Sequence, residues 1–308
     1  MDCLCISLFG KFCVTAPVQT TIVLDPTKVQ ELFFYLLLHA DRPHTREKLA
    51  ELLWQDSSAA QSRKYLRQTL WQLQSILDQF PCCQNLLTAD SDWIQINPAV
   101  PYWLDTQMFD HAYGQATGVD GAALETGTAQ ALMNAVMLYQ GDLLENWYQD
   151  WCLFERERLQ NELITMLHKL MVYCECTQQY EAGVIYGMQM LQFDQAREQT
   201  HRRLMRLYFL AGDRTRALRQ FERCKLVLRQ ELGVEPAQKT LELVQQIRQG
   251  TLSTPHSPAF QLPARPISAP PAAELLAHLH QLKETLLHAQ AQIDRNINLL
   301  QNQQPQNP

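Results

Sequence analysis

Strand-like and helical apolar patterns alternate in the N-terminal third of the chain. Residues 4–14 and 21–24 are rich in β-branched and aromatic side chains, which is typical of short strands. Pro26 then opens a helical apolar pattern, VQELFFYLLLHA, because proline is well tolerated in the first turn of a helix. Thr45 is placed to cap a second helix, REKLAELLW. The pattern predicts two strands followed by two helices.

A longer helix and a hairpin complete this region. Residues 57–77 repeat apolar side chains at helical spacing, with Ser57 or Ser58 as the expected cap. The apolar runs within 86–98 flank the turn-prone Asp90-Ser91-Asp92, which predicts a β-hairpin. Strands, three helices and a hairpin, in that order, indicate a winged helix-turn-helix over residues 1–98, with the third helix as the recognition helix and the hairpin as the wing.

From residue 104 to 249 the apolar pattern is helical throughout. Tyr180-Glu181-Ala182 has a counterpart about 35 residues later in the segment 213–217, and a helical pattern follows each of them. A repeat of about 34 residues is typical of tetratricopeptide-like helical hairpins, which stack to bury their apolar faces. The predicted fold class is therefore mainly α, with an α+β winged helix followed by an all-α tetratricopeptide-like domain.

The C-terminal segment has two parts. Residues 250–272 contain six prolines and indicate a linker. Residues 273–301 form an amphipathic, coiled-coil-like pattern, in which apolar residues step by alternating four and three positions: Leu275, Leu279, Leu282, Leu286, Ala289 and Ile293. We expect homo-oligomerisation through this segment. Docking onto the chain's own helical domain and an unattached tail remain alternatives.

The helix over 57–77 has two contrasting faces. One face carries an apolar stripe suited to a protein core: Ala59, Leu66, Leu70, Leu73 and Leu77. The opposite side is cationic and rich in amides, and it lacks an acidic residue until Asp78. Duplex DNA is a matching partner for such a face, because arginine forks suit guanine and glutamine amides suit adenine in the major groove.

The candidate DNA-binding residues lie on two helices. On the long helix, base edges are assigned to Lys64, Arg67, Gln68 and Gln72, and a phosphate to Arg63. Thr45, Arg46 and Lys48 begin the second helix, whose N-terminal N–H groups are expected to face a phosphate. Several alternatives remain: Arg63 or Arg67 pairs with the second domain, Gln68 and Gln72 are merely solvated, and Trp71 packs against protein rather than DNA. Trp54 is expected in the core.

Composition narrows the function classes. Apolar residues make up 46% of the chain and charged residues 19%, as in ordinary globular proteins. The sequence shows neither a membrane span nor a secretion signal, so we expect a cytoplasmic protein without membrane contact. The nine cysteines have no regular spacing, which favours reduced thiols and argues against a metal site. Cofactor and catalytic motifs are not evident either, so we do not expect an enzyme.

Charge is distributed unevenly. The whole chain carries −6, yet residues 42–72 hold six basic and three acidic side chains. Positive charge is thus concentrated on the predicted recognition segment, within an acidic protein.

Several local motifs, taken in order, resemble one family. In the first domain they are LFGKF at 8–12, TREKL at 45–49 with LLW at 52–54, and Leu66-Arg67 followed by Leu70 and Leu73. In the second they are LYQGDLL at 138–144, ER at 155–156, RL at 158–159, Glu198 with His201-Arg202, and ELGVEP at 231–236. The chain is therefore similar to bacterial transcriptional regulators of the antibiotic regulatory protein type. They join an OmpR-like winged helix to a bacterial transcriptional activation domain.

This resemblance implies a sequence-specific regulator of transcription, in particular an activator. It would bind double-stranded DNA, and its helical domain would mediate oligomerisation or contact RNA polymerase. Two departures are visible: Gln74 where the family often has arginine, and the acidic wing tip at 90–92. The acidic tip favours the alternative of a tetratricopeptide-like scaffold or signalling adaptor whose winged helix no longer binds DNA.

Overall fold

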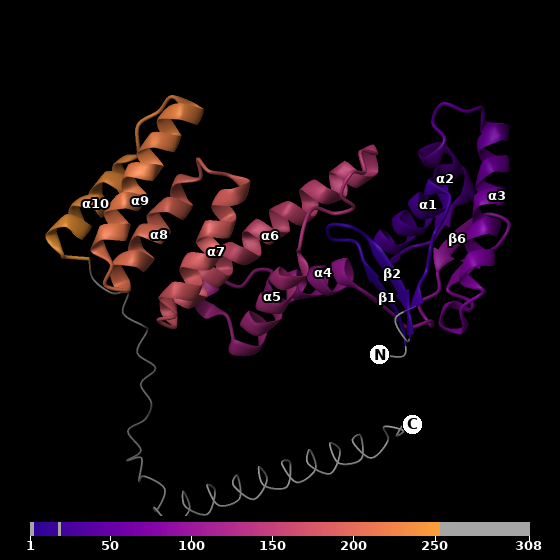
Figure 1. Ribbon diagram of the computed structural model, residues 1–308, viewed down its shortest axis with the longest axis horizontal. Coiled ribbons are helices and arrows are strands. Elements are labelled where there is room, and N and C mark those ends of the chain that lie inside the picture. Colours follow the sequence, from indigo (N-terminus) through magenta and orange to yellow (C-terminus); the bar gives the residue numbers. More distant parts are fainter. Residues whose placement is uncertain (1–2, 18–19, 253–308) are drawn as a thin grey trace, which may run out of the picture. The chain divides into compact units, whose positions relative to one another are not determined.

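The computed structural model describes residues 3–17 and 20–252 (Figure 1). The C-terminal helix expected at 273–301 and nearly all of the linker expected at 250–272 lie outside these residues. The predicted fold class is confirmed for the described part, in which two small sheets and three helices are followed by helices alone.

The first three strands of the chain belong to a four-stranded sheet. Its strands lie in the order β3-β2-β1-β7, with bounds Thr20–Thr21, Cys13–Ala16, Leu4–Ser7 and Tyr102–Leu104. The first three pair antiparallel, as short connections allow, whereas β7 pairs parallel to β1. The sequence pattern did not predict β7.

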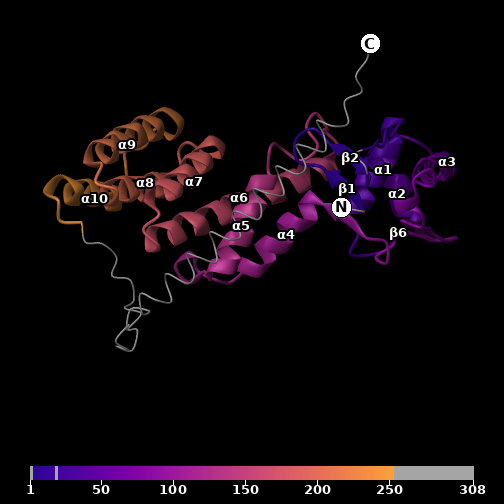
Figure 2. The same cartoon turned by 60° about the horizontal axis from the view of Figure 1, so that its bottom comes forward.

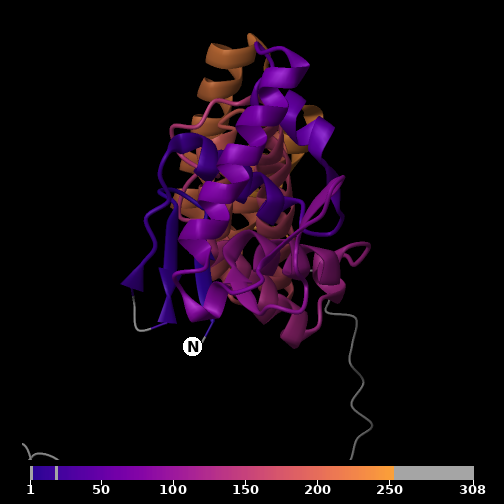
Figure 3. The same cartoon turned by 90° about the vertical axis from the view of Figure 1, so that its right-hand side faces the viewer.

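The three-helix unit and its wing follow the predicted order. The helices are α1 (Thr27–Leu38), α2 (Arg46–Leu53) and α3 (Ala59–Leu77). The predicted hairpin is confirmed as antiparallel β5 (Leu87–Ala89) and β6 (Trp93–Ile96), and the short β4 (His44–Thr45) joins β6. Thr45 caps α2 as expected, because its side chain accepts a hydrogen bond from Lys48 N at 3.4 Å. Figure 3 looks onto this part of the chain.

The remaining helices lie side by side in chain order (Figures 1 and 2). They are α4 (Asp105–Ala116), α5 (Thr126–Leu138), α6 (Asp150–Cys176), α7 (Tyr180–Phe193), α8 (Glu198–Leu210), α9 (Arg214–Val227) and α10 (Gln238–Gln249). Helices α7 and α9 begin 34 residues apart, at Tyr180 and Arg214. This spacing agrees with the predicted tetratricopeptide-like repeat.

The winged helix and the helical part share one buried core. Asp105, which begins α4, accepts hydrogen bonds from Leu8 N at 2.7 Å and Phe9 N at 3.0 Å, just beyond the end of β1. Trp151 of α6 reaches Glu31 of α1, with 3.4 Å between its indole nitrogen and the carboxylate. Because these contacts are buried, α1 and the first sheet are held against α4 and α6.

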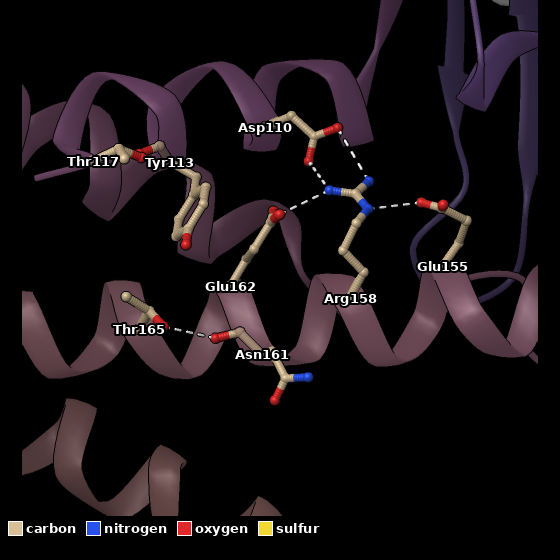
Figure 4. Close-up of polar contacts among 8 residues, drawn as sticks. All are labelled: Asp110, Tyr113, Thr117, Glu155, Arg158, Asn161, Glu162 and Thr165. Carbon is tan, nitrogen blue, oxygen red and sulfur yellow. Dashed lines mark hydrogen bonds and ion pairs between the residues drawn. The ribbon is translucent and has the colours of Figure 1, made fainter.

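A charged cluster joins α4 to α6 (Figure 4). Arg158 of α6 is 3.0 Å from Asp110 of α4, and it is 2.8 Å from both Glu155 and Glu162 on its own helix. Burial raises the pKa of Glu162 to about 7, although the positive charge of Arg158 opposes the rise. One arginine therefore holds three carboxylates that would otherwise repel one another.

Candidate nucleic-acid interface

Helix α3 buries the expected apolar stripe. Leu66, Leu70, Leu73 and Leu77 are all buried, and α3 packs against α1 and α2. Ala59 is the exception, because it is exposed at the first position of the helix. The stripe is extended instead by the buried Ser62, whose hydroxyl donates to Ser58 O at 3.0 Å. The leucines therefore fix which side of α3 faces outward.

The outward side carries the predicted polar residues. Lys64, Arg67 and Gln68 are exposed, and Gln72 is half-buried. Within the described part of the chain, neither Lys64 nor Arg67 forms an ion pair. Both cations therefore face solvent.

Arg63 has a partner, but in the winged helix itself. Its guanidinium lies 3.7 Å from the Glu47 carboxylate of α2, and both side chains are more than half exposed. This differs from the alternative in which Arg63 pairs with the second domain. Exposed pairs of this kind contribute little, about 0–1 kcal/mol, so a phosphate can displace Glu47 at small cost.

A hollow of about 1020 Å³ lies where α3, the start of α2 and the wing meet. Its lining brings together four of the predicted residues, Thr45, Arg46, Arg63 and Arg67, with Asp92 and Trp93 of the wing. Lys48, Lys64, Gln68 and Gln72 are not part of its wall. The helix side of the hollow carries three arginines and Glu47, and the wing tip adds Asp92.

The N-terminus of α2 differs from expectation. Arg46 N donates to Asp92 O at 2.9 Å, and Lys48 N donates to the Thr45 hydroxyl at 3.4 Å. Two of the N–H groups expected to face a phosphate therefore already have protein acceptors. The exposed side chain of Lys48 adds positive charge at this end.

The side chain of Arg46 contacts the wing. Its Nε donates to Asp90 O at 2.8 Å, so the side chain ties α2 to the turn of the β5–β6 hairpin. With the backbone bond to Asp92, this gives two hydrogen bonds between α2 and the wing tip. The structure gives Arg46 a positioning role that the sequence pattern did not predict.

The acidic wing tip has a structural reason. The Asp90 carboxylate accepts hydrogen bonds from Asp92 N at 2.8 Å and Trp93 N at 2.7 Å, as in an Asx turn. These backbone donors lower the pKa of Asp90 below its ordinary value. Asp90 is thus required by the turn.

Two exposed tryptophans flank the polar face. Trp71 on α3 is 67% exposed, which corrects the expectation that it packs against protein. Trp93 is 45% exposed, because β6 alternates and turns Ile94 and Ile96 inward. The alternation in WIQI was the available signal for Trp93. Trp54 is partly buried against the core, close to its expected place.

Three comparisons with known proteins bear on this architecture. Residues 104–248 match the bacterial transcriptional activator domain family. The fold is similar to that of a Mycobacterium tuberculosis structure described as EmbR in complex with low affinity phosphopeptide, with a TM-score of 0.64 and 16% identity. The match covers 81% of this chain and 66% of that one, and at this identity it shows the fold alone. None of the curated protein sequences is significantly similar to the chain.

Together with the order of elements, these matches confirm the resemblance seen in the sequence motifs. The matched family is one of transcriptional activators, not one of enzymes. Among the described residues, no helix has the length and apolarity needed to cross a membrane.

Proposed function

We propose that this chain, a regulator of the antibiotic regulatory protein type with a bacterial transcriptional activator domain over residues 104–248, binds duplex DNA sequence-specifically and activates transcription. The observation that carries the proposal is the outward face of α3. Lys64, Arg67 and Gln68 are exposed there, beside the hollow that α3 forms with the wing. Among the described residues, neither Lys64 nor Arg67 has an ion-pair partner.

Helix α3 would enter the major groove with this face. The Arg67 guanidinium can donate two parallel hydrogen bonds to guanine O6 and N7, and the Gln68 and Gln72 amides can pair with adenine N6 and N7. Lys64 is assigned to a base edge in the same groove. Each well-formed bidentate contact discriminates against a wrong base by about 1–3 kcal/mol.

The remaining cations would position the protein on the backbone. Arg63 would exchange its weak contact with Glu47 for a phosphate, and Lys48 would contribute charge at the start of α2. Thr45 and Arg46 would act indirectly, because they hold α2 to its cap and to the wing. Phosphate contacts of this kind set the register but carry no sequence information.

A scaffold without DNA binding is the second candidate. The observation that favours it is the acidic wing tip, where Asp92 lines the hollow that a phosphate would approach. In that case the helical domain alone would act, by contact with protein partners.

Selection from a library of random duplexes at physiological salt separates the two candidates. Enrichment of a defined sequence supports the regulator, and its absence supports the scaffold. If a site is enriched, Arg67→Ala should relax the preference at one position by about 5- to 150-fold. Lys48→Ala should instead weaken all sequences evenly and reduce the salt slope by about one. Arg229→Ala, an exposed cation on the helical domain, is the matched control and should change neither.

The helical domain would supply the further contacts of the regulator, with RNA polymerase or with a second copy of the chain. We assign self-association to the heptad pattern at 273–301. The regulated promoter would be read by the winged helix, in the cytoplasm.

A further inference from the structure

A second hollow, of about 510 Å³, lies on the helical domain. Three helices form its wall. Glu175 comes from α6, Gln199, Arg202, Arg203 and Arg206 from α8, and Lys239, Glu242, Leu243 and Gln246 from α10. These are the first helices of successive hairpins, so the hollow is a groove across the stack. We call this hollow the α6–α8–α10 groove.

The arginines of α8 share one buried carboxylate. Arg203 lies 2.7 Å and Arg206 3.0 Å from the Glu175 carboxylate, which is only 6% exposed. Glu175 is therefore the shared ion-pair partner of both arginines. Because a single negative charge faces two guanidinium groups, one positive charge remains uncompensated at this point.

Two further cations line the same groove. Arg202 is 3.6 Å from Glu198, but that carboxylate also accepts hydrogen bonds from Ala237 N and Thr240. Lys239 is exposed and has no ion pair within the part of the chain that the structure describes. With Glu198 included, four cations face three carboxylates at the groove, so one positive charge remains in excess, in a chain whose net charge is −6.

The guanidinium groups also keep donors to spare. Arg203 contacts Glu175 through Nη1 alone, and Arg206 does so through Nε and Nη2. Each arginine has five N–H donors in a planar fork that matches a carboxylate. The contacts with Glu175 therefore orient the forks without using all their donors, so a second carboxylate can bind to groups that are already in place.

The chemistry of the occupant follows from this charge. We propose that the α6–α8–α10 groove binds a carboxylate-rich peptide segment of a partner protein. The chain's own C-terminal segment is a poor match, because residues 251–308 contain only three acidic side chains and three basic ones. Duplex DNA is the other polyanion that the cations of the groove could attract, and the duplex measurement described below tests it.

The proposal deepens the partner contact that the proposed function assigns to the helical domain, and it rests on that function. It does not involve α3. A variant in the groove should therefore leave duplex binding unchanged, so failure of the groove and failure of DNA recognition can be told apart.

Fluorescence anisotropy of a fluorescein-labelled, glutamate-rich dodecapeptide tests the groove in the full chain. Its analogue with every glutamate replaced by glutamine is the ligand control. We expect the acidic peptide to bind, with an affinity that falls as salt increases, and the analogue not to bind. Lys239→Gln should weaken binding by about two- to fivefold, the effect of one exposed charge pair.

The variants are chosen so that loss of folding does not imitate loss of binding. Lys239 forms no hydrogen bond or ion pair with the described residues, so its substitution leaves the contacts of Glu175 intact. Arg219→Gln on α9 removes an exposed cation outside the groove and should leave the affinity unchanged. Arg203→Gln should weaken peptide binding further, with circular dichroism as the check on folding.

Three outcomes would overturn the proposal. The first is equal binding of the acidic peptide and its glutamine analogue. The second is equal loss of affinity in Lys239→Gln and Arg219→Gln, which would indicate unspecific charge attraction. The third is weaker duplex binding in Lys239→Gln with no effect on the peptide, which would assign the groove to nucleic acid.

Discussion

Asp105 joins the winged helix to the helical domain. We expect the free energy of unfolding to depend on whether its carboxyl group is protonated. Its carboxylate is 2% exposed and accepts hydrogen bonds from Leu8 N and Phe9 N. Burial raises the pKa of Asp105 to about 6, from an ordinary value of 3.8, although the backbone donors oppose the rise. One pKa unit corresponds to about 1.4 kcal/mol. The rise in the pKa of Asp105 therefore corresponds to about 3 kcal/mol in the free energy of unfolding.

The sign of the pH dependence follows from linkage. Between pH 3.8 and about 6 the folded protein keeps the proton on Asp105, whereas the unfolded chain loses it. The stabilisation by this group is therefore complete below pH 3.8 and is lost as the pH rises to about 6. Asp105→Asn keeps an oxygen that can accept from Leu8 and Phe9, but it cannot ionise. The variant should remove this part of the pH dependence.

Urea unfolding of the wild type and Asp105→Asn near pH 4 and near pH 7 measures the effect. The difference in unfolding free energy between the two proteins should change by about 2–3 kcal/mol between these conditions, in favour of Asp105→Asn at the higher pH. Asp41→Asn, which removes an exposed carboxyl group, is the control and should show about the same difference at both pH values. A constant difference for Asp105→Asn would refute the reasoning, because it would mean that burial does not hold the proton.

Three further predictions concern packing, charge and assembly. Gly121→Ala would place a methyl group 2.5 Å from Lys169 O, and it should cost about 1–3 kcal/mol in urea unfolding, whereas Gly127→Ala, with open space, should cost nothing. Arg158→Met leaves Asp110, Glu155 and Glu162 without their shared cation, so it should lower the melting temperature by about 3–6 °C at neutral pH. Deletion of 273–301 should shift the mass measured by light scattering toward the monomer; an unchanged mass would remove the self-association hypothesis.

Local patterns were sufficient for much of the fold. The leucines of α3, the β5–β6 hairpin and the Thr45 cap lie where the sequence places them, because each depends on residues within a few positions of one another. The repeat of the helical domain was also visible, since each hairpin repeats the same local pattern. Exposure of Lys64, Arg67 and Gln68 follows from the same leucine spacing.

The contacts of the polar residues could not be predicted in the same way. Nothing near Arg46 in sequence indicates that its side chain meets Asp90, and nothing near Arg203 indicates Glu175. Trp71 was expected to pack, and only the placement of the neighbouring elements leaves it exposed.

The sequence by itself determined the order of the first strands, the three helices and the hairpin, the buried side of α3 and the concentration of positive charge on α3. Helical and strand periodicities encode these features locally. The tertiary structure alone decided that β7 joins β1, that Asp105 is buried beneath the first sheet, and that the arginines of α8 gather around Glu175. Such contacts join residues far apart in the chain, and their energies depend on burial and geometry that exist only after the helices have packed.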